Sequence, residues 1–282
     1  MANEHINWYP GHMKKTRELI QENLKLINAA VEILDARIPV SSKNPVIDEL
    51  IKNKRRIVIL NKSDLGDPKA NEAWVKHFRA QGAEPVCMNA LTGEGMADLF
   101  KVMNRMKDEI NKDSVRKKPL RAMIVGIPNV GKSSLINRLA GKKSAKTGNK
   151  PGVTRGKQWI NLQDQIQLLD TPGILWPKFE DKEIALKLSF VGSIKDEVLD
   201  REDLTIELIK YLQERYPELL VNRYNIESVE GEPLDIMERI CDKRGFIMSG
   251  KRYDYVRAAR TIMDEFRGGK MGRITLEMPG DK

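Results

Sequence analysis

The sequence predicts an α/β fold, in which helices flank a mostly parallel sheet, followed by an all-α domain. Short apolar runs alternate with segments of helical spacing up to about residue 170, as expected for parallel strands joined by crossover helices. A glycine-rich loop follows one of these apolar runs. Beyond Pro177 the spacing is helical, with few strand signals. We therefore expect an α/β domain at residues 1–180 and a helical domain at residues 181–282.

In the first half of the α/β domain, three apolar runs are expected to form strands. Apolar residues between positions 14 and 26 recur at helical spacing, and the first apolar run follows them. The second run ends at Leu60 and so delivers Asn61 to the carboxyl end of a strand. The expected elements are a helix at 14–26, a strand at 29–34, a strand at 57–60, a helix around 74–78, a strand at 85–88 and a helix at 96–110.

The second half begins with a polar, basic connection at residues 111–119, where the two halves of the domain would be joined. An almost entirely apolar strand follows and leads into the glycine-rich loop. The further elements expected are a strand at 120–125, a helix at 134–139, strands at 159–162 and 166–169, and C-terminal helices at 204–212 and 256–266.

Composition limits the possible classes of protein. The chain has 282 residues, of which 40% are hydrophobic and 32% are charged, enough for one α/β domain and a smaller second unit. Cys87 and Cys241 lie far apart and outside any Cys-x-x-Cys or Cys/His cluster, which argues against a disulfide framework or a structural zinc site. The N-terminus lacks a signal-peptide pattern, and no stretch approaches the ~18 apolar residues of a membrane span. We expect a soluble, cytoplasmic protein.

The net charge of +9 is unevenly distributed along the chain. Residues 1–180 carry +12, residues 181–238 carry −8 and residues 239–282 carry +5. A basic excess favours polyanionic partners, although a solvated surface that only aids solubility is the alternative. Near the C-terminus, basic and aromatic residues are interleaved, as in a surface that binds phosphates and stacks on bases, or simply in a solvated helical face. These residues are Lys243, Arg244, Lys251, Arg252, Arg257 and Arg260, with Phe246, Tyr253 and Tyr255.

The segment from Gly126 to Ser133 reads Gly-x-x-x-x-Gly-Lys-Ser between an apolar strand and a helical segment, which is the context of a phosphate-binding loop. Main-chain N–H groups at the helix N-terminus are expected to surround a β-phosphate. Lys132 should reach the β and γ oxygens, and the Ser133 hydroxyl should bind Mg²⁺. A chance glycine-rich turn is the alternative. The residues expected to bind the nucleotide here are Asn129, Val130, Gly131, Lys132, Ser133 and Ser134.

Asn61, Lys62 and Asp64 form a second motif, Asn-Lys-x-Asp, at the end of an apolar strand. The Asp64 carboxylate can accept hydrogen bonds from guanine N1–H and from the exocyclic amine, whereas adenine offers no such pair. The motif therefore predicts binding of GTP and GDP, with an ordinary polar loop as the alternative. After the next strand, Asn89 and Ala90 are expected to present a main-chain amide to guanine O6. A plain turn without a role in binding is the alternative.

A third motif, from Asp170 to Gly173, also follows a strand. Asp170 can hold Mg²⁺ through water while the Gly173 amide senses the γ-phosphate. Thr154 is the candidate switch threonine that closes onto Mg²⁺, and a purely structural threonine is the alternative. The position after Gly173 commonly carries a glutamine that orients the attacking water, but here it is Ile174. An alkyl side chain cannot do this, so the catalytic group must come from elsewhere in the chain or from a partner.

The base-reading motif precedes the phosphate loop in this chain, whereas it usually follows it. The sequence therefore predicts a circularly permuted P-loop GTPase domain. The chain resembles the bacterial circularly permuted GTPases that assemble the large ribosomal subunit, and the resemblance covers nearly its whole length. It rests on the permuted motif order and on Trp8-Tyr9-Pro10-Gly11-His12-Met13, Asp35-Ala36-Arg37-Ile38-Pro39 and Asp170-Thr171-Pro172-Gly173-Ile174-Leu175-Trp176-Pro177.

This resemblance implies hydrolysis of GTP to GDP and phosphate during late assembly of the large (50S) subunit, with rRNA and ribosomal proteins as partners. It also implies that the C-terminal helical domain binds RNA. We expect no membrane partner and a monomer in solution. Among other functions, a GTPase for another RNA or a small-subunit precursor, a switch that binds proteins, and an RNA scaffold with a structural nucleotide remain open.

The resemblance further implies that His12 takes the place of the missing glutamine, while a histidine that packs the N-terminal segment or contacts RNA is the alternative. Asn129 matches a position that helps to hold K⁺ in potassium-activated GTPases, and an asparagine that stabilises a turn is the alternative. The catalytic candidates are His12, Lys132, Thr154 and Gly173. The metal candidates are Ser133, Thr154 and Asp170 for Mg²⁺ and Asn129 for K⁺.

Overall fold

The computed structural model of the chain describes residues 18, 20–141, 158–170, 181–194 and 200–281. The chain forms two compact units. The first unit contains residues 1–180 and also Thr275–Lys282, and the second contains Asp181–Ile274. The prediction placed residues 275–282 in the helical domain, whereas they belong with the α/β unit. The helical unit is thus joined to the α/β unit through the chain at both of its ends.

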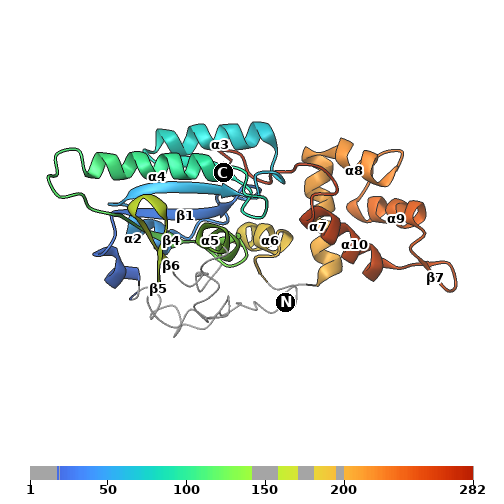
Figure 1. The fold of residues 1–282 in the computed structure, drawn as a ribbon. Helices are drawn as coiled ribbons and strands as arrows, with labels where there is room; N and C mark the ends of the chain where they lie inside the picture. Colours follow the sequence, from blue (N-terminus) through green and yellow to red (C-terminus); the bar gives the residue numbers. More distant parts are fainter. Residues whose placement is uncertain (1–17, 19, 142–157, 171–180, 195–199, 282) are drawn as a thin grey trace. The chain divides into compact units, whose positions relative to one another are not determined.

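The first unit is built on one six-stranded sheet with helices on both sides (Figure 1), which confirms the predicted α/β fold. Its strand order is β3-β2-β1-β4-β6-β5, and every neighbouring pair is parallel except β5 with β6. The strands are β1 (Ala29–Asp35), β2 (Arg55–Asn61), β3 (Glu84–Met88), β4 (Leu120–Val125), β5 (Gln158–Asn161) and β6 (Ile166–Asp170).

Strand β1 lies between β2, which leads into the Asn-Lys-x-Asp motif, and β4, which leads into the phosphate loop. Asp35 pairs with Asn61 in the register of β1 and β2, and Ile124 pairs with Asp170 in that of β4 and β6. Because these strands are parallel, their carboxyl ends meet at one edge of the sheet, where ligands bind in open α/β folds. The sheet therefore brings the three predicted motifs to one edge.

Two of the helices of the first unit begin at side-chain caps. Asn44 accepts from the amides of Val46 and Ile47 at the start of one helix, and Asp67 accepts from the Ala70 amide at the start of the next. The helices are α2 (Pro45–Ile51), α3 (Pro68–Ala80), α4 (Met96–Ile110) and α5 (Lys132–Ala140). The bounds of α4 and β4 match the prediction, whereas α2 was not predicted because its seven residues hold too little periodicity.

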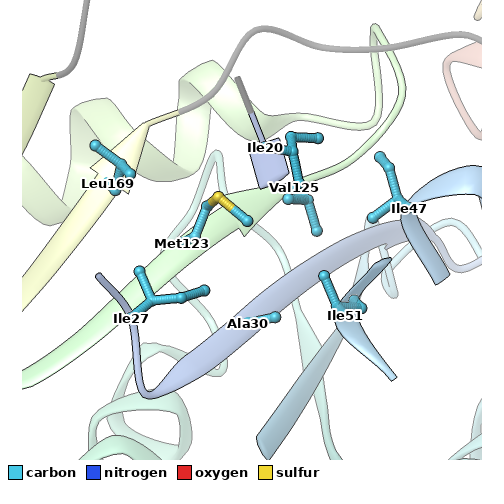
Figure 2. Close-up of a cluster of buried hydrophobic side chains, with 8 residues drawn as sticks. All are labelled: Ile20, Ile27, Ala30, Ile47, Ile51, Met123, Val125 and Leu169. Carbon is cyan, nitrogen blue, oxygen red and sulfur yellow. The ribbon is translucent and has the colours of Figure 1, made fainter. Parts of the chain in front are cut away.

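Two clusters of buried side chains hold the helices on the sheet. In the first, Ile47 and Ile51 of α2 pack with Ala30, Met123 and Val125 of the strands, as Figure 2 shows. In the second, Trp74 and Phe78 of α3 pack with apolar residues of β1 and β2. The clusters include residues at the carboxyl ends of strands, such as Val125 and Leu60, so that this edge of the sheet is a rigid platform for loops.

The second unit is mainly helical, as predicted, and also contains a short antiparallel hairpin that was not predicted. The pair β7 and β8 is only two residues long on each side, which leaves no period to detect. The elements are α6 (Lys182–Phe190), α7 (Arg201–Arg215), α8 (Pro217–Tyr224), α9 (Pro233–Arg244), β7 (Ile247–Met248), β8 (Arg252–Tyr253) and α10 (Tyr255–Arg267). In the described part of the chain, no helix has the length and apolar character that crossing a membrane requires.

Candidate functional site

Asn61 begins residues 61–67, which we call the base-reading loop. It connects this loop to the phosphate loop, residues 126–133, and to the loop after β3. Its amide Nδ2 donates to the Val130 carbonyl over 2.6 Å, and its Oδ1 accepts from the Ala90 amide over 2.9 Å. The side chain is only 2% exposed, so both bonds are shielded from water. One buried amide therefore holds together three loops that are far apart in the sequence.

Gly131 is required at the point where the Asn61 side chain meets the phosphate loop. Its φ of +100° lies in the region that favours glycine, and a Cβ atom here would collide with Asn61 Nδ2. Gly126, at the other end of the loop, packs against β1, where a Cβ atom would come within 2.8 Å of the Ile33 carbonyl oxygen. The two glycines thus allow the close approach of the phosphate loop to the strands beside it.

Lys62 crosses from the base-reading loop to the phosphate loop. Its Nζ donates to the Asn129 carbonyl over 2.9 Å and to Asp35 Oδ2 over 2.8 Å. Lys62 and Asn129 both have left-handed backbones, with φ of +57° and +64°. Such conformations are uncommon for residues other than glycine, and they concentrate at functional sites. The ammonium group is therefore held between one carboxylate and one loop carbonyl.

Asp35 is the fully buried carboxylate that holds Lys62. Its two oxygens also accept from Arg37, through Nε at 3.0 Å and through the terminal nitrogen at 2.8 Å. Burial by itself would raise the pKa of Asp35, but the charges and hydrogen bonds of Arg37 and Lys62 outweigh burial and hold the pKa well below its usual range. Asp35 is therefore ionised at neutral pH and can orient Lys62.

Lys132 and Asp170 meet across the carboxyl ends of β4 and β6. The Lys132 Nζ lies 2.9 Å from Asp170 Oδ1, and both side chains are largely shielded from solvent. Helix α5 begins at Lys132, so the first-turn amides of this helix lie beside that pair. Ser133 is exposed and Ser134 is half-buried in the same turn. This arrangement places a helix N-terminus, an ammonium group and a carboxylate side by side.

The loop after β3 is organised by Asn89. Its Oδ1 accepts from the amides of Leu91 and Thr92, and Arg138 of α5 donates to the Ala90 and Leu91 carbonyls. Because the Ala90 amide already donates to Asn61, it could contact a guanine O6 only by sharing or releasing that bond. The predicted contact between Ala90 and the base stays a prediction.

Other predicted residues are placed differently or lie outside the described part of the chain. Asp64 is exposed, and no hydrogen bond or ion pair of its carboxylate is found among the described residues. Within that same part of the chain, no group of three or more His, Cys, Asp or Glu residues could hold a metal ion. The predictions for His12, Thr154, Gly173 and Ile174 lie outside the described residues.

The predicted basic and aromatic surface of the helical unit is formed in part. All six basic residues predicted there are exposed. Phe246, by contrast, is 6% exposed, and Arg257 lies over its ring at 4.9 Å from the centroid. The proposed stacking role of Phe246 is therefore wrong, since a buried ring cannot stack on a base. Tyr253 and Tyr255 are half-buried, and their hydroxyls donate to Asp242 and Glu238.

Three residues of the site were not predicted as functional from chemistry alone. Asp35 and Arg37 entered the sequence analysis only through a resemblance, and Arg138 did not enter it. A signal existed for Asp35, because it ends an apolar strand just as Asn61 and Asp170 do. No local signal distinguishes Arg138 from an exposed helical arginine.

Fold and site together define the class of protein. A phosphate loop between β4 and α5, a guanine-type Asn-Lys-x-Asp motif that begins at the end of β2, and the aspartate that ends β6 meet at one edge of the sheet. The motif that reads the base comes first in the chain. These features are those of a circularly permuted P-loop GTPase. The model of the family described as "50S ribosome-binding GTPase" matches residues 121–237, a stretch that begins in β4 and leaves out the base-reading motif upstream.

Relatives of known name cover nearly the whole chain. The chain is 44% identical over 278 residues to "Ribosome biogenesis GTPase A" of Bacillus cereus, covering 97% of this chain and 94% of the relative. It is 34% identical to the protein of the same name from Thermotoga maritima, covering 98% and 95%. This chain belongs to the ribosome biogenesis GTPase A family, and it is a GTP hydrolase that binds guanine nucleotides.

Two solved structures agree with this assignment. The GDP-bound structure of TM YlqF superposes with a TM-score of 0.69 at 30% identity and covers 93% of this chain and all of that chain. The GNP-bound structure of YlqF from T. maritima has a TM-score of 0.65 at 31% identity and covers 95% of this chain and all of that chain. Both likenesses extend over the α/β and helical units of the sequence.

Proposed function

We propose that this chain is a Mg²⁺-dependent GTPase that binds an immature large ribosomal subunit in its GTP state and leaves it after hydrolysis. The observation that carries the proposal is the attachment of Asn61 and Lys62 to carbonyls of the phosphate loop, which sets a guanine reader beside a phosphate cradle. The ribosomal target is supported by the names of the relatives and by the family description, which mentions the 50S subunit. The basic excess of residues 1–180 supports an RNA-containing partner.

Asp64 is the residue we propose to read the base. Its carboxylate is exposed, so it is available to accept from guanine N1–H and the exocyclic amine. Asp64→Asn replaces an acceptor by an amide donor, which suits xanthine because that base has a carbonyl in place of the amine. The variant should lose GTP affinity by at least ~100-fold and gain affinity for XTP. Equal losses for both nucleotides in a fluorescent-displacement titration would contradict this role.

Ser133, Thr154 and Asp170 are the proposed Mg²⁺ ligands, with Asp170 acting through water. Hydroxyl and carboxylate oxygens are the donors that this ion prefers. When bound, the ion would neutralise charge on the β- and γ-phosphates. In this proposal Lys132 turns from Asp170 to the phosphate oxygens, and the amides of the first turn of α5 hold the β-phosphate. The helix N-terminus next to Lys132 supports this assignment.

His12 is the proposed orienter of the attacking water, because Ile174 cannot accept a hydrogen bond. His12→Ala should lower the turnover rate by about 10-fold or more while GTP affinity stays within about twofold. Asn129 is the proposed K⁺ contact, supported by its exposed side chain in the left-handed turn of the loop. Hydrolysis should then be faster in K⁺ than in Na⁺ at equal ionic strength. Unchanged turnover in His12→Ala, or equal rates in the two salts, would remove the respective assignment.

The deciding experiment is the rate of GTP hydrolysis in K⁺ buffer with and without purified large ribosomal subunits, with small subunits as the control. A site without its glutamine should be slow alone, at about 10⁻⁴ to 10⁻² s⁻¹, and a partner that completes it can raise the rate by roughly 10³- to 10⁵-fold. Stimulation of more than about tenfold by large subunits alone supports the proposal. Selective stimulation by small subunits, or none by either particle, contradicts the partner and leaves the GTPase.

The helical unit is proposed to contact rRNA through its exposed basic residues, of which Lys251 and Arg252 lie in the hairpin. Replacing both with Glu should weaken binding to the particle and reduce the dependence of affinity on salt. If the affinity of the variant for the particle depends on salt concentration as steeply as that of the unaltered protein, the proposed rRNA contact is contradicted. The ribosomal role also supports a cytoplasmic location, and we propose that the protein is a monomer off the particle.

A further inference from the structure

The last described residues of the chain, Thr275–Asp281, form a buried segment on the α/β unit, which we call the C-terminal strap. Thr275, Leu276 and Glu277 have exposures of 1%, 0% and 3%. A carboxylate at 3% exposure must be hydrogen-bonded, because an unpaired buried charge is strongly destabilising. The partners of Glu277 therefore show what the strap holds.

Glu277 caps the loop that follows β1. Its Oε2 accepts from the Val40 amide over 2.6 Å, its oxygens accept from the Ser41 amide over 3.1 and 3.2 Å, and the Ser41 hydroxyl donates to Oε1. The neighbouring Leu276 amide donates to the Arg37 carbonyl over 2.7 Å. The strap thus supplies hydrogen-bond partners to main-chain groups of Arg37, Val40 and Ser41, in the loop after Asp35.

Arg37 and Asp35 connect this loop to the nucleotide site. The main-chain amide and two side-chain nitrogens of Arg37 donate hydrogen bonds to the Asp35 carboxylate. Asp35 in turn holds Lys62, whose Nζ donates to the phosphate-loop carbonyl of Asn129. Each of these hydrogen bonds has a distance of 3.1 Å or less; those between Arg37 and Asp35 are buried, that between Lys62 and Asp35 is partly buried, and that between Lys62 and Asn129 is exposed.

The strap also holds the other end of the base-reading loop. Thr275 Oγ1 accepts from the Asp67 amide over 2.9 Å. Gly66 leaves just enough room for this contact, because a Cβ atom there would lie 3.2 Å from Thr275 Oγ1 and 2.9 Å from Asn71 Oδ1. The Asn71 side-chain Nδ2 donates to the Ser63 carbonyl over 2.9 Å. The backbone on both sides of Asp64 is therefore tied down.

The strap itself is anchored on α3. Trp74 Nε1 donates to the Glu277 carbonyl over 2.9 Å, and Met278 packs against the cluster that contains Trp74 and Phe78. A rigid helix thus holds the strap, and the strap holds two loops. Since the Asp64 carboxylate has no bond of its own among the described residues, the backbone of its loop sets its position.

We propose that Glu277 and Thr275 are positioning residues for guanine recognition, acting through the loops after β1 and β2 on Lys62 and Asp64. This inference rests on the proposed role of Asp64 as the base reader. The strap follows directly on the helical unit in the chain, so support for the base reader is covalently continuous with that unit. Loss of the strap contacts increases the mobility of the base-reading loop and weakens discrimination between bases.

The test compares dissociation of fluorescent GDP and IDP from the full-length chain, because inosine lacks the exocyclic amine that Asp64 would read. Glu277→Gln keeps the size of the side chain but turns an amide donor toward main-chain donors, and Thr275→Val removes the acceptor for Asp67. The GDP/IDP discrimination is the ratio of the IDP dissociation rate to the GDP dissociation rate. Each variant should lower this ratio by about three- to tenfold. Glu230→Gln, the same change at an exposed carboxylate of the helical unit, is the matched control and should leave the ratio unchanged.

The ratio of two nucleotides separates positioning from stability, because general destabilisation weakens both equally. If Glu277→Gln and Thr275→Val lower the unfolding midpoint but keep the GDP/IDP ratio of the unaltered chain, the positioning role is wrong and the strap only stabilises the fold. Asp64→Ala in the same assay separates this inference from the proposed function. Discrimination lost in Asp64→Ala but kept in the strap variants overturns the inference alone, and discrimination kept in Asp64→Ala overturns both.

Discussion

Gly131→Ala offers a direct test of how the phosphate loop is joined to the base-reading loop. The backbone of Gly131 has φ of +100°, and the added methyl group would collide with the Asn61 amide. Asn61 would have to give up its bonds to the Val130 carbonyl and the Ala90 amide, or the loop would have to shift. Either outcome breaks the junction of the three loops.

The cost can be estimated from two contributions. Placing alanine in a left-handed conformation costs about 1–2 kcal/mol, and losing two buried hydrogen bonds of Asn61 costs about 1 kcal/mol each. The expected loss of unfolding free energy is therefore about 3–4 kcal/mol. Gly82→Ala is the matched control, since its φ is +76° and a Cβ atom there meets nothing within 4 Å. That control should lose only the backbone contribution of about 1–2 kcal/mol.

A urea titration followed by tryptophan fluorescence measures these losses in the α/β unit, because all four tryptophans lie within residues 1–180. With a slope of about 2 kcal/mol per molar urea, Gly131→Ala should lower the midpoint by about 1.5–2 M and Gly82→Ala by about 0.5–1 M. Fluorescent GDP should bind to Gly82→Ala and fail to bind to Gly131→Ala. Equal midpoints and equal GDP affinities in the two variants would refute the reasoning.

Three further variants test other contacts. Asp35→Asn should cost about 3 kcal/mol at pH 7 in the same titration, because it leaves Arg37 and Lys62 with a neutral buried partner. Since the pKa of Asp35 is lowered in the fold, its stabilisation is complete above about pH 4 and is lost as the pH falls below that value, so the gap between variant and unaltered chain should narrow only there. A constant gap down to pH 2 would contradict this. Lys132→Ala should weaken GDP and GTP binding by at least ~100-fold, which equilibrium titration measures; retained affinity would exclude its phosphate role. Glu265→Gln removes the paired acceptor of Arg223, at 2.9 Å from its Nε, and should destabilise the helical unit by about 1–3 kcal/mol in a circular dichroism melt without changing GDP affinity; a large loss of GDP affinity would contradict that separation.

Much of the fold was predictable because its signals are local. The helix Met96–Ile110 and the strand Leu120–Val125 have the periodicities of their classes, and their bounds were predicted correctly. Shorter elements escaped prediction. The hairpin of β7 and β8 and the helix Pro45–Ile51 have too few residues for a period to be visible.

The nucleotide motifs were also predictable, because each is a short run in which the residue types alone define the chemistry. Asn61 and Asp170 were identified at the carboxyl ends of strands and Lys132 at the end of the loop that follows another strand, and the parallel sheet brings those strand ends together. The order of the motifs along the chain, with the base reader first, was sufficient to predict the permutation. It can be read from the sequence without any knowledge of contacts.

The tertiary structure alone decided how the motifs are connected. The hydrogen bond from Lys62 to Asp35 joins residues 27 positions apart, and the hydrogen bond from Ser41 to Glu277 joins residues 236 positions apart. No local pattern encodes such partners, because a buried carboxylate obtains its hydrogen bonds from whatever the fold brings beside it. The sequence by itself therefore predicted which groups bind the nucleotide, whereas the packing of distant segments decided which residues hold those groups in place.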